Sequence, residues 1–586
     1  MRGLKASAVL AVLAATLAPP IARAQQATDQ YQPENGTGRT QREVVRAKQY
    51  MVSAANPIAA EAGRNVLEKG GNAVDAMVAV QLVLGLVEPQ SSGLGGGAFA
   101  LLYDGKSGKL TSFDGRETAP KEATPALFLD GEGKPLKFFD AVVGGRSVGT
   151  PGTVRLLADM HARHGRLPWA ELFEPAIALA DKGFTVSPRL NALISDTADT
   201  LYVHEATRDY FLSEEGVPIF VGTLLKNPAY AQTLRAIAVG GADAFYKGEI
   251  AGDIVAAVRG ATGNPGVLSA DDLASYKVIE REPVCVTYRA LDVCGMGPPS
   301  SGALSIGQIL KMVEPYDLKS LGPDSAQSWR LIGDASRLAF ADRELYMADA
   351  DFVKMPKGLT NAAYLAERAK LLDGKQALPA DAVKAGEPPS DHAMNLAPGD
   401  TIEFPSTSHF SIVDSDGNVV SMTTTIENGF GSRLMVRGFL LNNELTDFSF
   451  LPERDGVAVA NRVEPGKRPR SSMAPTIVLR DGKPELAIGS PGGSRIIGFV
   501  AKTLVAFIDW EMDIQTAISL PHLVNRYGSY DLEEGTSAES LAPDLAALGY
   551  EVVARELNSG LHGIAIYADH LEGGADPRRE GIAIGK

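Results

Sequence analysis

The sequence predicts a layered α/β domain, in which buried helices pack against strands. Two observations indicate it: residues 72–87 form a helical pattern that is apolar nearly all round, and residues 409–426 alternate as strands do. Between them, residues 379–406 contain five prolines among Gly and Asp, which break any regular element. This third feature predicts an exposed linker, the kind of segment at which chains are cut.

The first half of the chain is rich in helical patterns. Residues 56–69 have helical spacing that ends at Gly70-Gly71, a typical C-cap signal. The helix that follows begins with Asn72 and Asp75 at capping-box spacing, and a further long helix covers about 326–347. Since the second of these helices has almost no polar face, we expect it to be buried.

The alternating segment at 409–426 predicts a β-hairpin whose turn is Asp-Ser-Asp-Gly-Asn at 414–418. A three-residue loop within this turn would place Thr407 opposite Thr425. Glu427 would then lie just beyond that end of the hairpin, on the same face as Thr425. A two-residue turn would give another register, so this pairing depends on the length of the loop.

The chain begins with the three parts of a secretory signal peptide. Arg2 and Lys5 are basic, residues 6–17 are apolar, and Ala-Arg-Ala at 22–24 is a small-x-small cleavage pattern. We therefore expect a signal peptide at 1–24, export across the inner membrane, and a periplasmic or extracellular protein.

The remaining composition is that of an ordinary globular protein, with 45% hydrophobic and 22% charged residues. The net charge is −15 and no cluster of Lys and Arg occurs, which argues against nucleic acid or an anionic membrane surface as a partner. No apolar run after the signal peptide is long enough for a membrane span.

The two cysteines, Cys285 and Cys294, lie in a segment with the pattern of a hairpin. If Arg289 and Ala290 form its turn, the cysteines face each other and can form a disulfide in an oxidising compartment. No metal-ligand spacing surrounds them, so we expect no metal site.

Several other motifs do not indicate a catalytic site. The glycine-rich run at 93–98 follows a helical pattern rather than a strand, so it predicts a tight turn and not a dinucleotide site. The chain has no P-loop lysine and no His-Glu-x-x-His. His409 is interpreted as structural rather than as a catalytic base.

Thr407, at the junction of the linker and the first strand, is the candidate nucleophile. A threonine at the N-terminus of a chain carries its own base, because the α-amine titrates near ~8. Cleavage before Thr407 would therefore create the catalyst. Taken alone, Ser-Thr-Ser at 406–408 is more often a polar linker.

Nine motifs, in order along the chain, carry a family resemblance. They are Gly-Gly-Asn-Ala-Val-Asp-Ala at 70–76, Ser-Gly-Leu-Gly-Gly-Gly at 92–97, Asp-Gly-Arg-Glu-Thr-Ala-Pro at 114–120, Pro-Pro-Ser-Ser-Gly at 298–302, Thr-Ser-His-Phe-Ser at 407–411, Asp-Gly-Asn at 416–418, Asn-Asn-Glu-Leu-Thr-Asp-Phe at 442–448, Lys-Arg-Pro-Arg-Ser-Ser-Met at 467–473 and Gly-Ser-Pro-Gly-Gly-Ser-Arg at 489–495. In these motifs the chain resembles the γ-glutamyltranspeptidases over nearly its whole length.

The resemblance implies a fold and a maturation step. The fold is a four-layer αββα sandwich of the N-terminal-nucleophile hydrolase type. One precursor would cut itself between Ser406 and Thr407 into a large subunit, 25–406, and a small subunit, 407–586, which stay together as one folded unit.

The resemblance also implies the site. Thr407 matches the nucleophile, Thr425 the threonine bonded to it, and Gly492 and Gly493 the oxyanion hole. The donor's α-carboxylate would be held by the residues that match Arg116, Ser471 and Ser472, and its α-ammonium by those that match Glu444 and Asp447. Position 427 is Glu where some relatives carry Asn, so we expect Glu427 to join the substrate-binding residues and make the ammonium end more acidic.

The implied substrates are glutathione and other γ-glutamyl compounds, with water, amino acids or dipeptides as acceptors and no cofactor. Two alternatives stay open: a glutaryl or cephalosporin acylase of the same superfamily, and a periplasmic γ-glutamyl-binding protein without activity. Residues 448–466 occupy the position of a lid in some relatives, and here they lack tyrosine.

Overall fold

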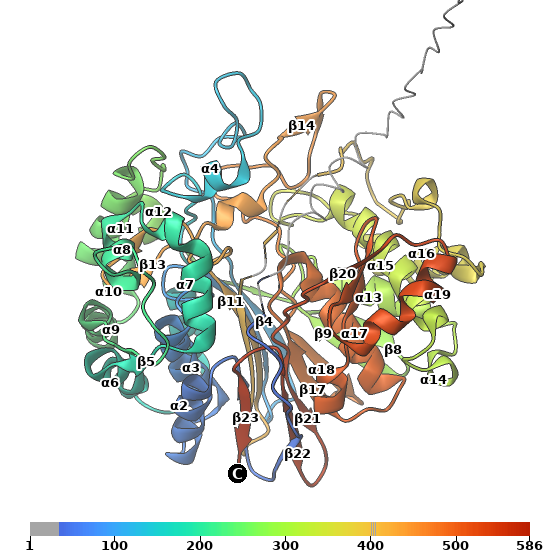
Figure 1. Cartoon of the computed structure of the whole chain (residues 1–586), viewed down its shortest axis with the longest axis horizontal. Helices are drawn as coiled ribbons and strands as arrows, with labels where there is room; N and C mark the ends of the chain where they lie inside the picture. Colours follow the sequence, from blue (N-terminus) through green and yellow to red (C-terminus); the bar gives the residue numbers. More distant parts are fainter. Residues whose placement is uncertain (1–33, 35, 400, 402, 405) are drawn as a thin grey trace, which may run out of the picture.

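The computed structural model describes residues 34, 36–399, 401, 403–404 and 406–586, so the signal peptide expected at 1–24 lies outside the described residues. Two seven-stranded sheets stand face to face in the middle of the molecule, and helices cover the outer face of each (Figure 1). These four layers confirm the αββα sandwich expected for the chain.

The first sheet has the order β23-β2-β10-β11-β3-β4-β7, and all its neighbouring strands are antiparallel. Its strands are β2 (Met51–Ala54), β3 (Gly97–Tyr103), β4 (Leu110–Gly115), β7 (Ile279–Arg281), β10 (Ser408–Val413), β11 (Val419–Thr425) and β23 (Ile582–Gly585). It thus joins segments from both ends of the chain around the central pair β10 and β11.

The predicted helix pair covers the outer face of this sheet. α2 (Pro57–Glu68) begins after Asn56, whose side chain caps it, and α3 (Ala73–Val87) begins with the expected capping box of Asn72 and Asp75. Every residue of α3 is buried, because it lies between α2, the sheet and further helices. The other helices of this side are α5 (Thr153–His164), α6 (Glu174–Lys182), α7 (Pro188–Leu201), α8 (Glu205–Phe211), α9 (Pro228–Gly240), α10 (Asp243–Tyr246), α11 (Glu249–Arg259) and α12 (Ala270–Ser275).

The second sheet has the order β1-β22-β21-β17-β16-β9-β8. Its strands are β1 (Val45–Ala47), β8 (Val284–Tyr288), β9 (Leu291–Gly295), β16 (Thr476–Arg480), β17 (Lys483–Gly489), β21 (His562–Ile566) and β22 (Leu571–Ala575). The helices that cover it are α13 (Gly302–Val313), α15 (Ala326–Tyr346), α17 (Ile496–Ile508) and α18 (Ile514–Ser519), with α14 (Leu318–Leu321), α16 (Ala362–Ala369) and α19 (Ala542–Ala547) further out. The long helix expected at 326–347 is therefore α15.

The β8–β9 hairpin has the predicted register. Cys285 pairs with Cys294, and a disulfide joins them. The turn residues Arg289 and Ala290 both have positive φ, 49° and 65°, as a two-residue turn between twisted strands requires.

The β10–β11 hairpin also has the register expected from a three-residue loop, since Ser408 pairs with Thr424 and the pairing continues to Val413 and Val419. Gly417 takes the left-handed conformation at φ 80°. Alternate residues of the hairpin face the second sheet, as the bond from Ser411 Oγ to the carbonyl of His562 indicates. By the same alternation, the side chains of Thr407 and Thr425 lie on this face of the hairpin.

The remaining short elements lie around this sandwich. They are α4 (Phe138–Val142), β5 (Phe184–Thr185), β6 (Leu224–Leu225), β12 (Met435–Val436), β13 (Phe439–Leu440), β14 (Glu453–Arg454), β15 (Val457–Ala458), β18 (Leu523–Asn525), β19 (Tyr530–Glu533), β20 (Val552–Arg555) and the 3-10 helices η1 (Trp169–Phe173), η2 (Lys357–Thr360), η3 (Lys370–Asp373), η4 (Ala380–Ala382), η5 (Glu444–Asp447), η6 (Gly493–Arg495) and η7 (Ser537–Leu541).

The linker at 379–406 differs from the expectation in its last part. Its beginning is largely exposed, with only the short η4, but Thr401 and Ser406 are buried and the Glu403 side chain is 4% exposed. The prediction of an exposed linker is therefore wrong for these residues. The reason is tertiary, because Glu403 forms an ion pair with Arg343 inside the protein.

Candidate active site

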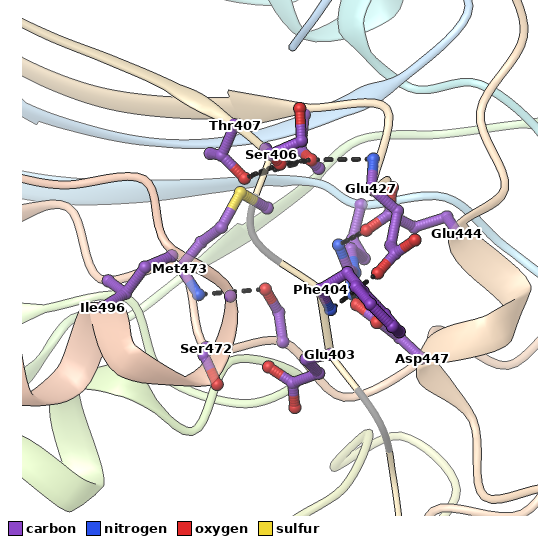
Figure 2. Close-up of a pocket in the computed structure, with 14 residues that line it drawn as sticks. Glu403, Phe404, Ser406, Thr407, Glu427, Glu444, Asp447, Ser472, Met473 and Ile496 are labelled. Carbon is purple, nitrogen blue, oxygen red and sulfur yellow. Dashed lines mark hydrogen bonds and ion pairs between the residues drawn. The ribbon is translucent and has the colours of Figure 1, made fainter. Parts of the chain in front are cut away.

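The carbonyl oxygen of Ser406 lies between two threonine hydroxyls. Thr407 Oγ1 donates to it across a short hydrogen bond, and Thr425 Oγ1 donates to it over 3.2 Å. The two hydroxyl oxygens are 3.3 Å apart, and the N–H of Glu427 donates to Thr425 Oγ1 over 2.8 Å. The hairpin register thus brings both hydroxyls to the peptide bond before Thr407. Figure 2 shows Thr407 beside Ser406 at this bond.

Three buried contacts fix the backbone on both sides of this bond. Ser406 Oγ donates to the carbonyl of Gln90 over 2.8 Å, and Arg579 donates to the carbonyl of Thr407 over 3.1 Å. Ser408 Oγ donates to Glu88, which itself pairs with an arginine. The bond therefore lies in a rigid, water-poor environment although it follows a linker.

A buried ionic cluster lies beside the threonines. Arg116 is 1% exposed and forms ion pairs with Glu444 and Asp447, both on η5, and it also donates to the carbonyl of Pro469 over 3.2 Å. Glu427 and the neighbouring Asp447 line the same pocket (Figure 2). One cation thus faces several acids within one pocket.

Burial raises the pKa of each of these acids. It raises the pKa of Glu427 well above the usual range, and the neighbouring Asp447 adds to the effect. Burial also raises the pKa of Asp447 well above the usual range, although Arg116 opposes the shift. The pKa of Glu444 is raised in the same way, although Arg116 opposes the shift. Glu117, the residue after Arg116, is fully buried and has a pKa raised to about 8, chiefly by burial. These acids gain from a second cation in the pocket.

The two serines lie on the other side of the pocket. Ser471 Oγ accepts from the N–H of Met473 over 3.1 Å. Ser472 Oγ accepts from Arg343 over 2.8 Å, and the carboxylate of Glu403 is bonded to the same serine and arginine. Both serines line the pocket that contains Arg116.

The two glycines form the turn that leads into α17. Gly492 has φ 135° and Gly493 φ 57°, values that favour glycine. Gly493 lines the pocket, and a Cβ there would lie 2.8 Å from the carbonyl oxygen of Glu403. Gly492 lies next to it, against the ring of Phe499. The absence of side chains thus lets this turn approach the backbone before the threonine.

Three residues just before Thr407, namely Glu403, Phe404 and Ser406, enter the pocket itself. The N–H of Phe404 donates to Glu427 over 3.1 Å (Figure 2). The centroid of the Phe404 ring lies 4.4 Å from that of Phe138. Glu403, Phe404 and Ser406 line the pocket together with Thr407. In the intact chain this segment therefore occupies the space in front of the threonine.

The structure brings all the predicted site residues to this one place, with Gly492 at its edge. His409, as interpreted from the sequence, has a structural position: its ring bonds to Thr423 and Ser411, and burial lowers its pKa well below the usual range. Among residues 34, 36–399, 401, 403–404 and 406–586 there is no group of three or more His, Cys, Asp or Glu that could bind a metal.

Sequence reasoning missed Glu117, Glu403 and Arg343. Glu117 follows Arg116 within a recognised motif, which was a usable signal. Glu403 and Arg343 are 60 residues apart, and neither lies in a motif that assigns it to the site.

Residues 448–466 start next to the acids of η5. Phe450 stacks on Phe128 at 4.5 Å, and β14 and β15 form a small hairpin. Asn461 then returns to the pocket wall and donates to the carbonyl of Asp447 over 2.7 Å.

None of the helices in the described part of the chain has the length and apolarity needed to cross a membrane.

Comparison with known proteins gives consistent matches. The family model of gamma-glutamyltranspeptidase matches residues 59–586. The glutathione hydrolase proenzyme of Escherichia coli (strain K12) is 39% identical over 546 residues, which cover 91% of each chain. The corresponding proenzyme of Bacillus subtilis (strain 168) is 38% identical over 551 residues and 92% of each chain. Among solved structures, the cephalosporin acylase from Bacillus halodurans superposes with a TM-score of 0.80 at 26% identity, covering 95% of this chain and 99% of the acylase.

Proposed function

The chain belongs to the γ-glutamyltranspeptidase family, and we propose on that premise that it transfers γ-glutamyl groups from amide donors such as glutathione to water, amino acids or dipeptides. The proposal includes self-cleavage between Ser406 and Thr407 into subunits 25–406 and 407–586. It requires no cofactor.

Self-cleavage would start from the contacts around the Ser406 carbonyl. Thr407 Oγ1, already in contact with this group, attacks the carbonyl carbon. Thr425 Oγ1, which donates to the same oxygen, would stabilise the negative charge that develops there. The acyl group moves from nitrogen to oxygen, and water then hydrolyses the ester. The products are a carboxylate on Ser406 and a free α-amine on Thr407.

Turnover would use the new α-amine as the base. Thr407 Oγ1 attacks the γ-carbonyl of the donor while the amine takes its proton, and the N–H groups of Gly492 and Gly493 receive the oxyanion. The proton then passes to the leaving amine as the C–N bond breaks. Water or an acceptor amine next attacks the γ-glutamyl ester and releases Thr407.

The observation that carries the proposal is the ion pair of Arg116 with Glu444 and Asp447. An α-amino acid brings a carboxylate and an ammonium on one carbon. It can therefore give Arg116 a new anion and the acids a new cation without changing the net charge of the buried cluster. Ser471 and Ser472 lie in the same pocket and would complete the carboxylate site.

The acylase alternative is favoured by the TM-score of 0.80 with a cephalosporin acylase. A glutaryl group, however, has the carboxylate without the ammonium. It would leave Glu444 and Asp447, both buried, with one cation fewer than a γ-glutamyl group provides. We therefore rank this alternative second. The inactive binding protein ranks third, because Thr407 already contacts the bond that it would cut.

We also propose export to the periplasm or the extracellular space. The basic and apolar start of the chain supports it, as does the disulfide between Cys285 and Cys294, which persists in oxidising compartments.

The experiment is an assay of the purified protein with γ-glutamyl-p-nitroanilide, with and without glycylglycine. We expect release of p-nitroaniline by two-piece protein, and faster release with glycylglycine if transfer accompanies hydrolysis. A protein that is cut at Thr407 yet releases no p-nitroaniline from this donor, while it cleaves glutaryl-p-nitroanilide, would replace the proposal with the acylase.

A further inference from the structure

Four buried charges connect the linker to the back of the pocket. Arg343, on α15, and Arg470 are both 0% exposed. Glu344 pairs with both arginines, at 2.6 and 2.8 Å, and Glu403 pairs with Arg343. These contacts define a quartet of two arginines and two glutamates.

The quartet is neutral only while Glu403 is in place. Burial alone would raise the pKa of Glu403, but Arg343 and Arg470 hold it below its usual value, so Glu403 is ionised. Burial likewise opposes the charge of Arg343, and Glu403 and Glu344 more than offset this and raise its pKa. Withdrawal of Glu403 would leave two buried cations with one anion, a costly state unless another anion enters.

Glu403 is on the segment that the proposed cut releases. It lies four residues before Thr407, and its segment fills the pocket that a donor must enter. Arg343 and its partners Glu344 and Ser472 are held elsewhere in the fold and would remain. The groups that bind the Glu403 carboxylate therefore stay in the folded protein, whereas Glu403 itself lies on the segment that the cut releases.

We propose that the position of the Glu403 carboxylate, between Arg343 and Ser472, becomes the subsite for the donor's α-carboxylate once the chain is cut. The inference rests on the γ-glutamyl transfer proposed above and adds Arg343 as a second cation of the donor site. Glu403 is then an internal stand-in for the substrate, which satisfies the subsite until cleavage.

Charge balance explains why Arg116 alone is not sufficient to bind the donor's α-carboxylate. Arg116 is paired with Glu444 and Asp447, and both acids stay in the pocket after the cut. Arg343 is the arginine that loses a partner. Ser472 links it to the donor, because its hydroxyl contacts Arg343 and also lines the pocket beside Thr407.

The first test compares two donors that differ only in this carboxylate, γ-glutamyl-p-nitroanilide and 4-aminobutyryl-p-nitroanilide. In processed Arg343→Gln, we expect the preference for the γ-glutamyl donor, as kcat/KM, to fall at least about tenfold through a higher KM. Arg343→Lys keeps the charge and should retain part of the preference. A preference unchanged in processed Arg343→Gln would overturn the proposal.

The matched control is Arg337→Gln. Arg337 is on the same helix, is 5% exposed, and pairs with Asp334 over 3.1 Å. Its other side-chain bonds go to the carbonyl groups of Tyr527 and Leu378, so it contacts no member of the quartet. The substitution removes a buried arginine from α15 and leaves the contacts of Glu403 and Ser472 unchanged. The donor preference of this variant should equal that of the wild type.

The second test needs no variant, in case Arg343→Gln does not fold. The peptide amides Thr-Ile-Glu-Phe-Pro-Ser and Thr-Ile-Gln-Phe-Pro-Ser, which copy residues 401–406 with and without the carboxylate, are added to processed wild-type protein. We expect the Glu peptide to bind at least about tenfold more tightly, by competition with the donor and by calorimetry. Equal binding, or no binding of either peptide, would overturn the inference. Because calorimetry requires no turnover, its result is separate from a failure of the proposed activity.

Discussion

Thr407 and Thr425 lie opposite each other across the β10–β11 hairpin, with 3.3 Å between their hydroxyl oxygens and the Ser406 carbonyl in contact with both. The first prediction follows from this geometry. Thr407→Ala removes the attacking hydroxyl, so the chain should remain intact on a denaturing gel. A variant that still splits between 406 and 407, as N-terminal sequencing would reveal, points to an external protease instead.

Thr425 should speed the cut by stabilising charge on the Ser406 oxygen. Thr425→Val keeps the shape of the side chain but removes the donor, and we expect processing to slow by about 10²-fold or more. Thr424→Val is the control, because its hydroxyl bonds to the carbonyl of Gly97. Time courses of the fraction cut would compare them. Equal rates for the Thr425 variant and the wild type would exclude this role.

Glu117 should make the intact chain less stable as the pH rises. Its pKa is about 8 in the folded protein, against an ordinary value of 4.5. Between these values the folded state keeps the proton that the unfolded state loses, so this group's contribution to stability decreases with pH. In a Thr407→Ala background, Glu117→Gln should therefore raise Tm more at pH 8 than at pH 5. Parallel Tm curves for the two proteins would contradict the assignment.

Much of the fold could be predicted from local patterns in the sequence. The capping box of Asn72 and Asp75, and the turn glycine Gly417, fix helix starts and strand register through contacts only a few residues apart. Such contacts depend on residue type and spacing, both of which are visible in a sequence.

The site could be predicted from the sequence less completely than the fold, for a physical reason. Arg343 and Glu403 are charged residues on a helix and in a proline-rich linker, where charged side chains are usually solvated. Their ion pair exists only because the fold brings together residues 60 positions apart. The exposure expected for the linker was wrong at Glu403 for the same reason.

The disulfide between Cys285 and Cys294 should form in the exported protein. It closes a short loop, with a sequence separation of nine, so its loss should cost at most about 2–3 kcal/mol. Thiol labelling of the unfolded, unreduced protein should detect no free thiol. Two labelled thiols per chain would contradict the prediction, and denaturant unfolding of a Cys285→Ala, Cys294→Ala variant would measure the contribution.

The donor's ammonium should decide between the two candidate activities. Glu444 and Asp447 share Arg116 in the intact chain, and burial raises the pKa of both carboxyls, so a further cation lowers the energy of the pocket. A γ-glutamyl group brings this cation and a glutaryl group does not. Sites built around a polar group often reject the analogue that lacks it by about 10⁴-fold. We therefore expect γ-glutamyl-p-nitroanilide to be cleaved at least about 10³-fold faster, as kcat/KM, than glutaryl-p-nitroanilide.

Asp447→Asn should narrow this ratio mainly by slowing cleavage of the γ-glutamyl donor. The substitution removes an acid that would pair with the ammonium of this donor, and it leaves in place the carboxylate site that both donors use. Comparable rates on the two anilides in the wild type would show that no ammonium site operates, and the acylase activity would then be the better assignment.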